Sequence, residues 1–168
     1  MPVFLANANW GRWILNTMWN DFVANLGGLG YSLYLDGGYL PELTSDDLGR
    51  LEFRMDGPKT RQRRYDHFIL DDITINIHGQ VMSGQGDLAS ARRIMGLVAR
   101  WLGQDHCINR LGPDSGGIDD GSLVGTLVLQ TQGRLDGVEE NYLGHEEHNN
   151  FDQFSVSAPF RMYLTSGD

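Results

Sequence analysis

The fold is decided by residues 64–102, RYDHFILDDITINIHGQVMSGQGDLASARRIMGLVARWL. From His67 to about Val81 apolar and polar residues alternate, which predicts a long β-strand with one buried face. The apolar residues are even-numbered at first and odd-numbered later (Phe68 and Leu70, then Ile73, Ile75 and Ile77). One extra residue in a strand exchanges its two faces, so we expect a β-bulge at Asp71-Asp72.

A helix is predicted directly after this strand, over residues 88–102. Its apolar residues recur at intervals of three and four, which places them on one helical face: Leu88, Ala91, Ile94, Met95, Val98, Trp101 and Leu102. Asp87 is a suitable N-cap, and Gly103 is a suitable residue to end the helix. The quoted stretch therefore predicts a strand that leads into an amphipathic helix.

A second amphipathic helix is predicted near the N-terminus, over residues 10–26. The residues with helical spacing are Trp10, Trp13, Ile14, Thr17, Met18, Phe22, Asn25 and Leu26. Asn9 is a plausible N-cap, and Gly27-Gly28 can supply the positive φ that often ends a helix. Trp10 and Trp19 have two interpretations: ordinary core packing, or a subunit contact, where tryptophan is enriched. Trp10 is therefore a candidate interface residue.

The remaining strands are predicted from alternation and turn residues, over 31–36, 50–56, 122–132 and 153–165. Residues 57–66, GPKTRQRRYD, form a polar, basic connection, so that 50–56 and 67–81 become the two arms of a long β-hairpin. Proline cannot donate a hydrogen bond to a neighbouring strand, so Pro159 predicts that its strand is an edge strand or carries a bulge. Residues 103–121 and 133–152 are expected to be long polar loops.

The resulting order, α-β-β-β-α-β-β, lacks the repeated strand-helix-strand units of a parallel sheet. We therefore expect a single α+β domain over residues 1–168. It should consist of an antiparallel β-sheet with a long hairpin and two amphipathic α-helices packed on the sheet. A chain of 168 residues is long enough to bury a substantial core.

Composition and charge exclude several classes of function. The chain has 22 acidic and 13 basic residues, a net charge of −9, which argues against general affinity for nucleic acid. The only cysteine, Cys107, excludes an internal disulfide and a cysteine-based zinc site. No apolar run is long enough to predict a membrane span, and the N-terminal residues do not predict a secretory signal.

Four features suggest chemistry, and each has a simpler interpretation. Residues 84–89, GQGDLA, have the spacing of a dinucleotide-binding turn, but Asp87 would repel a pyrophosphate, so we interpret them as a turn and an N-cap. Residues 145–148, HEEH, lack the spacing of a zinc helix, and we expect an acidic loop. The aspartates of 114–120 lack the ligand order of a calcium loop. Cys107 follows His106, but adjacent strand residues face opposite sides and no orienting group is apparent. We therefore expect no enzyme, no cofactor and no metal site.

Opposite charges gather in two separate segments of the sequence. The basic segment contains Lys59, Arg61, Arg63 and Arg64, and the acidic segment contains Asp136, Glu139, Glu140, Glu146, Glu147 and Asp152. In a ring of identical subunits, a head-to-tail interface can bring the basic segment of one copy against the acidic segment of the next. The alternative is that both segments are solvated loops.

The order of elements, with residues 64–102 as its most similar stretch, resembles the tail terminator proteins of long-tailed bacteriophages. In that stretch, a strand with alternating isoleucines passes through a short polar turn into a helix that carries alanine and arginine. The resemblance is one of pattern and covers most of the chain. It implies a structural protein that forms a hexameric ring, caps the finished tail tube and ends its polymerisation.

The resemblance also implies partners and a location. The partners are further copies of the chain, the tail tube protein and a head-side connector or stopper protein, with no membrane involved. DNA passes through the lumen without specific binding, which an acidic chain suits. The protein would be assembled in the host cytoplasm and would reside in the neck of the virion. Two alternatives stay open: a major tail tube subunit, which shares the sheet-plus-helix pattern, and a small nucleotide- or metal-binding enzyme that uses residues 84–89.

Overall fold

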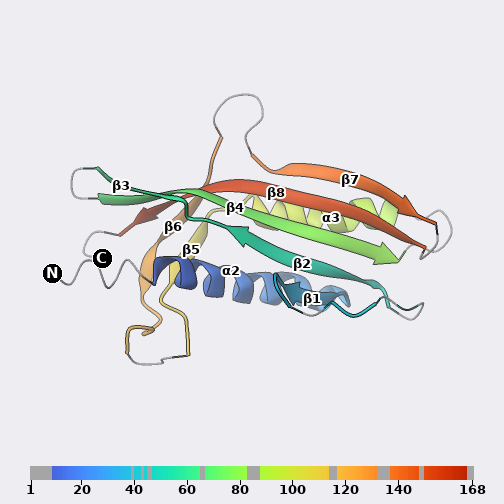
Figure 1. Ribbon diagram of the computed structural model, residues 1–168, viewed down its shortest axis with the longest axis horizontal. Helices are drawn as coiled ribbons and strands as arrows, with labels where there is room; N and C mark the ends of the chain where they lie inside the picture. The colour runs from blue at the N-terminus through green and yellow to red at the C-terminus, as the bar shows by residue number, and fades with distance from the viewer. Residues whose placement is uncertain are drawn as a thin grey trace.

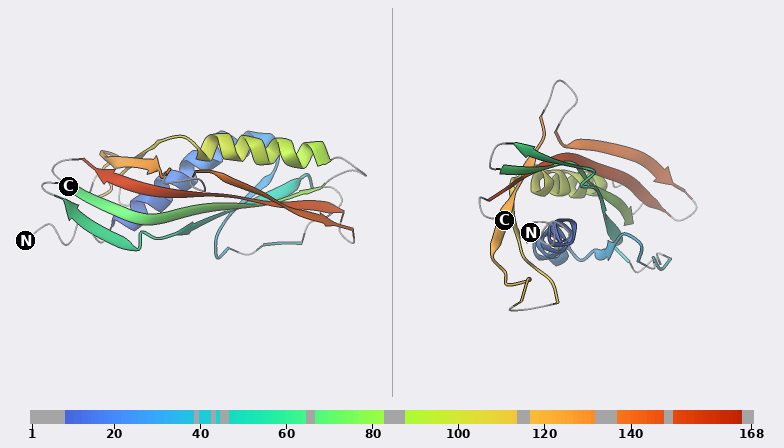
Figure 2. Two further views of the ribbon diagram at one scale, coloured as in Figure 1. Left: turned by 90° about the horizontal axis from the view of Figure 1, so that it is seen from above. Right: turned by 60° about the vertical axis from the view of Figure 1, so that its left-hand side comes forward.

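The computed structural model describes residues 9–38, 40–42, 44, 47–64, 67–82, 88–113, 117–131, 137–147 and 150–165. Within this part of the chain, two α-helices lie along one curved β-sheet (Figure 1). The sheet curls around the helices, as the views in Figure 2 show. The architecture is therefore mixed α and β, as the sequence predicts. Neither described helix is both long and apolar enough to cross a bilayer.

The sheet follows the strand order β1-β2-β4-β8-β6-β5, with β3 attached to β4 and β7 attached to β8. The strands are β1 Ser32–Leu35, β2 Gly49–Asp56, β3 Thr60–Arg64, β4 His67–Met82, β5 His106–Asn109, β6 Leu123–Leu129, β7 Glu139–Glu146 and β8 Phe151–Leu164. The pairs are antiparallel except for β1 with β2, which is parallel. The expectation of an antiparallel sheet is therefore corrected at β1, where a long connection returns the chain to the same end of the sheet.

The first helix, α2, spans Trp10–Leu26, as predicted. Its buried side is formed by the expected apolar stripe: Trp10, Trp13, Ile14, Thr17, Met18, Phe22 and Leu26. Its ends differ from the prediction. The Asn9 side chain makes no capping bond and accepts a hydrogen bond from Arg12 at 3.2 Å. Gly27 has a φ of −64°, and a 3₁₀ turn over Gly27–Leu29 delays the left-handed residue to Gly30, whose φ is 86°.

The second helix, α3, spans Leu88–Leu102, which agrees with the prediction, whereas its proposed cap Asp87 lies outside the described residues. The helix packs on β8, with further contacts to β4 and β7. Both helices meet in an aromatic cluster. The ring of Phe22 in α2 lies 5.7 Å from the ring of Phe53 in β2 and 5.4 Å from that of Trp101 in α3. The two helices and the sheet therefore share one core.

The predicted β-bulge is confirmed in β4. The register between β4 and β8 shifts between Leu70 and Ile73, and Asp72 adopts a φ of 58°, which is unusual for a residue with a side chain. Asp71 is buried at this point. Its carboxylate accepts hydrogen bonds from Arg161 in β8 and from Gln130, the latter at 3.2 Å. The bulge therefore turns a carboxylate inward, where two donors satisfy it.

Pro159 corrects the expectation of an edge strand, because β8 lies in the middle of the sheet. One side of β8 pairs with β4, and the other side pairs with β7 up to Ser157 and with β6 from Phe160 onward. The Pro159 carbonyl accepts a hydrogen bond from the Gln130 amide at 2.9 Å. Since the N and the carbonyl of a strand residue face the same side, the missing N–H falls in the gap between β7 and β6.

Three strands lie where the sequence predicts loops. β3 lies within the basic connection, β5 within residues 103–121 and β7 within residues 133–152. All three are polar or short, so they lack the alternation that marks a half-buried strand. Hydrogen bonds to a neighbouring strand hold each of them: β3 to β4, β5 to β6 and β7 to β8. The arms of the predicted hairpin, β2 and β4, do pair antiparallel, and β3 prolongs the first arm.

Candidate functional site: two charged edge strands

The basic and the acidic segments of the sequence form two edge strands, β3 and β7. Among the described strands, β3 pairs with β4 alone, and β7 pairs with β8 alone. β3 lies beside the first residues of β4, whereas β7 lies beside the half of β8 that pairs with the last residues of β4. The two strands therefore occupy diagonally opposite corners of the central β4–β8 pair, and Figure 1 shows them toward opposite ends of the long axis.

β3 has the sequence TRQRR, which gives it three positive charges and no negative charge. Two basic side chains, one just before β3 and one within it, interact within the chain. Lys59 forms an ion pair with Asp56 at 2.6 Å, which raises the pKa of the lysine. The guanidinium of Arg61 lies over the ring of Trp10, 5.5 Å from its centroid. Arg63 and Arg64 belong to β3 by their backbone, and their side chains lie outside the described part of the structure.

β7 has the sequence EENYLGHE, with three carboxylates. Glu139 and Glu140 are exposed at its start, and Glu139 accepts a hydrogen bond from Asn141 at 3.0 Å. Glu146 is half-buried at its end and accepts a hydrogen bond from Gln153 at 3.3 Å. Glu147 is exposed in the turn that follows, and Asp136 lies outside the described residues. The acidic segment is thus largely a strand rather than the predicted loop.

Asp152, which we placed in the acidic segment, is buried and anchors β7 instead. Its carboxylate accepts a hydrogen bond from the Tyr142 hydroxyl at 2.7 Å and lies 3.1 Å from Nδ1 of His145. The hydrogen bond to Asp152 raises the pKa of Tyr142 because it favours the protonated phenol. The guanidinium of Arg92 in α3 lies 5.4 Å from the centroid of the Tyr142 ring. These contacts fix the acidic strand to both β8 and α3.

Trp10 is not a surface residue in this structure. Its side chain is fully buried, which is a correction to its place among the interface candidates. The reason is that it lies on the apolar stripe of α2 and is covered by the sheet, while Arg61 of β3 lies over its ring. Trp10 therefore supports the basic strand from inside the molecule.

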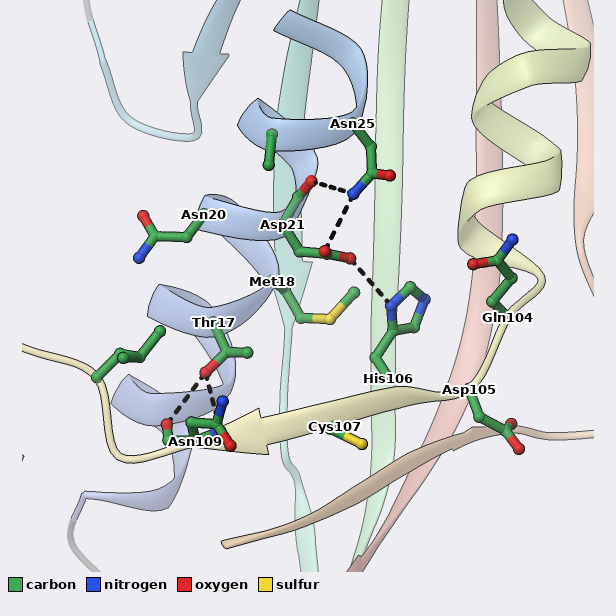
Figure 3. A pocket seen from close by; sticks show the side chains of 12 residues that line it. Thr17, Met18, Asn20, Asp21, Asn25, Gln104, Asp105, His106, Cys107 and Asn109 are labelled. Atoms are coloured by element: carbon green, nitrogen blue, oxygen red, sulfur yellow. Dashed lines mark hydrogen bonds and ion pairs between the residues drawn. The ribbon is translucent and has the colours of Figure 1, made fainter. Parts of the chain in front are cut away.

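A cavity of about 470 Å³ opens between α2 and β5 (Figure 3). Asp21 is one of the lining residues; its carboxylate accepts a hydrogen bond from Trp101 at 2.8 Å and lies 3.3 Å from Nδ1 of His106. Asp21 is the orienting group for His106 that could not be found in the sequence, because the two residues lie on elements far apart in the chain. Nε2 of His106 is buried and has no hydrogen-bond partner among the residues that the structure describes, and Cys107 is exposed beside it. The buried Nε2 cannot reach a molecule in the cavity, so we interpret the pair as a link between α2, α3 and β5.

The other predicted motifs are used differently or are not described. His145 lies in β7, where its Nδ1 is close to the Asp152 carboxylate, and His148 lies outside the described residues. The side chain of Asp119 is fully buried and accepts hydrogen bonds from both terminal nitrogens of Arg12, at 2.7 and 3.0 Å, and from Trp13 at 2.7 Å. Residues 83–87, which contain most of the glycine-rich motif, lie outside the described part of the chain.

Comparisons with known proteins add no family. No family model matches the sequence. No curated protein matches it either.

Proposed function

We propose that this protein is a structural assembly protein whose copies join head to tail into a closed ring, in the role of a phage tail terminator. One observation carries the proposal: a basic edge strand and an acidic edge strand lie at diagonally opposite corners of the same sheet. A head-to-tail interface requires two different and complementary patches on each copy, and these two strands meet that requirement.

The charges also favour a ring over a two-fold dimer. β3 and β7 lie on opposite edges of the sheet, so a two-fold interface built on one edge sets that edge against its own copy, β3 facing β3 or β7 facing β7. Like charges placed opposite each other in strands are destabilising, and like-charge contacts across interfaces select against wrong partners. The pairing of β3 with β7 is therefore the electrostatically favoured one.

The negative net charge suits a ring through which DNA passes. With a net charge of −9, such a ring would repel the phosphates of a duplex at close range, so DNA would not adhere to it. The ring would cap the tail tube, end its polymerisation and present its other side to the head-side connector or stopper protein. The resemblance to tail terminators supports these partners.

Native mass spectrometry and negative-stain images of the purified chain test the proposal. We expect a closed ring, a hexamer on the resemblance to tail terminators, that weakens as the salt concentration rises, because salt screens charges on exposed strands. A chain that stays monomeric at high concentration and low salt would contradict the proposal. Long filaments of the chain alone would indicate a tail tube subunit instead.

A charge-swap series tests the observation that carries the proposal. E139K with E140K should abolish the ring, and R63E with R64E should do the same, because each places like charges in the interface. A chain with all four substitutions should form rings again, since the two strands have then exchanged their charges. The control is E42K with D105K, which changes the net charge as much as the β7 variant does, at exposed positions outside both strands. Loss of rings in this control would contradict the assignment of the interface.

A further inference from the structure

The outer edges of β3 and β7 remain unpaired within the described chain. Each strand pairs on one side only, with β4 or with β8. An unpaired edge presents a row of backbone donors and acceptors that can bond to a strand of another chain. Proteins usually blunt such edges, and charged side chains are one common means. Here the two longest unpaired edge strands, β3 and β7, carry opposite charges. Each strand therefore repels the same strand of another copy and can still pair with the other strand.

From this arrangement we infer that β3 of one copy adds to β7 of the next through main-chain hydrogen bonds, so that one β-sheet continues from subunit to subunit. This inference rests on the proposed ring and specifies how its subunits join. The five residues of β3 fit along the eight residues of β7. Side-chain charges select the partner, and the backbone supplies the continuous contact.

The other two edge strands fit this role less well. β1 and β5 each have four residues, and their sequences, SLYL and HCIN, contain no aspartate, glutamate, lysine or arginine. Short edge strands offer few backbone groups. They also offer no charge complementarity that would select a partner or a register. The choice of β3 and β7 therefore follows from both length and charge.

The topology sets the direction of the pairing. β3 is antiparallel to β4, β4 is antiparallel to β8, and β8 is antiparallel to β7. β3 and β7 of one copy therefore run in opposite directions. Rotation about the ring axis keeps the sense of each strand along that axis, so β3 of one copy meets β7 of the next antiparallel. Because the two strands lie at diagonal corners, their pairing shifts each copy along the strand direction of its neighbour, so the ring closes with its strands tilted to the ring axis, as in closed barrels.

Both strands are held in place before any partner arrives. The contacts of Tyr142 with Asp152 and with Arg92 fix β7 to β8 and α3. The stacking of Arg61 on the buried ring of Trp10 fixes β3 against α2. Strands that are ordered in advance lose less entropy on association.

Hydrogen exchange of the assembled ring tests the inference directly. A monomeric reference is available in the β7 charge variant, E139K with E140K, which leaves the anchoring residues of β7 unchanged. We expect backbone amides in β3 and β7 to exchange more slowly in the ring, at alternate residues, because only every second amide points to the outer edge of a strand. Contact between side chains alone would not produce this alternation. A ring in which amides of β3 and β7 exchange as fast as in the monomeric variant would overturn the inference.

Disulfide cross-linking gives a second and independent readout. In a C107S background, R64C, at the end of β3 that antiparallel pairing sets against the start of β7, is combined with a single cysteine at Glu139, Glu140 or Asn141. Neighbouring strand residues face opposite sides, so the cross-link between subunits should form either at Glu140 alone or at its two neighbours but not at Glu140. Equal cross-linking at all three positions, or none in an intact ring, would contradict strand pairing. Failure of strand pairing is thus seen in rings that persist, whereas failure of the proposed function is seen as the absence of rings.

Discussion

At the scale of single residues, Gly79 shows how tightly side chains pack between neighbouring strands of the sheet. It lies near the C-terminal end of β4 and pairs with Phe154 of β8. A Cβ atom at Gly79 would lie 2.2 Å from the Phe154 ring, far inside any normal contact. The aromatic ring therefore occupies the space that a side chain at Gly79 would fill.

We expect Gly79→Ala to lower the free energy of unfolding by about 1–3 kcal/mol, because the methyl group forces the Phe154 ring or the backbone to move. Urea unfolding followed by fluorescence measures the change. Gly96→Ala is the matched control, since Gly96 lies on the exposed side of α3 with open space around it. That control should stabilise the protein by up to about 1 kcal/mol through helix propensity. Equal stabilisation by both variants would show that Phe154 does not occupy this space.

His78 gives the stability of the protein a dependence on pH. Its pKa is lowered, first by burial and then by the positive charge of Arg54. The unfolded chain therefore takes up a proton at the ordinary pKa of histidine while the folded chain still resists it. Stability should fall as the pH drops through the ordinary pKa of histidine, and this loss should level off once the pH lies below the lowered pKa of His78.

We expect His78→Gln to reduce the difference in unfolding free energy between about pH 7.5 and about pH 5.0, the range in which an ordinary histidine titrates. Urea unfolding of the two proteins at each pH measures this difference. The ring resonances of His78 in a nuclear magnetic resonance titration give its pKa directly. A titration at or above the ordinary histidine range would contradict the predicted direction.

At the scale of elements, α2 is joined to the β5–β6 connection by polar contacts. The Asn16 amide donates to the carbonyl of Leu111 at 2.8 Å, and the Thr17 hydroxyl donates to that of Asn109 at 3.0 Å. Asp119 adds its bonds with Arg12 and Trp13 and is the buried carboxylate of this group. Hydrogen bonds therefore join α2 both to β5, through Thr17, and to the β5–β6 connection, through Asn16 and Trp13.

We expect Asp119→Ala to destabilise the protein by about 2–3 kcal/mol, since it removes hydrogen bonds to a charged partner and leaves a buried donor of Trp13 unsatisfied. Thermal unfolding and urea unfolding measure the loss. Asp120→Ala is the control, because Asp120 is exposed and its carboxylate bonds locally to Ser122. The control should change stability little. Similar losses in both variants would show that the connection does not depend on the contact with α2.

Elements with strong periodicity could be predicted from the sequence, and polar ones could not. Both helices and the bulge in β4 follow from the spacing of apolar residues, which burial of one face imposes. β3 and β7 are edge strands with charged residues, so no apolar alternation marks them, and only their pairing with β4 and β8 defines them as strands. The link from Asp21 to His106 joins segments far apart in the chain, and no local pattern can reveal it.

At the scale of the whole molecule, the segregation of charge could be seen in the sequence, whereas its geometry could not. The sequence places basic and acidic residues in different segments. The structure adds that these segments are strands on opposite sides of a central pair, and that Lys59, Arg61 and Asp152 are occupied by contacts within the chain. Fewer charged side chains therefore contribute to the proposed interface than the sequence suggests, and main-chain hydrogen bonds contribute a larger part of it.

The central pairing of β4 with β8 also governs how the chain reaches this structure. Ile77 pairs with Val156 although α3, β5, β6 and β7 all lie between them in the chain. The loop between the two strands must close before their contacts can compensate for its lost entropy, which is typical of proteins that fold over about milliseconds to seconds. β7 can pair only after β8 is in place, so the acidic edge should be completed late in folding. The two charged edge strands then form one after the other. Chains that are still being synthesised therefore associate less readily with one another.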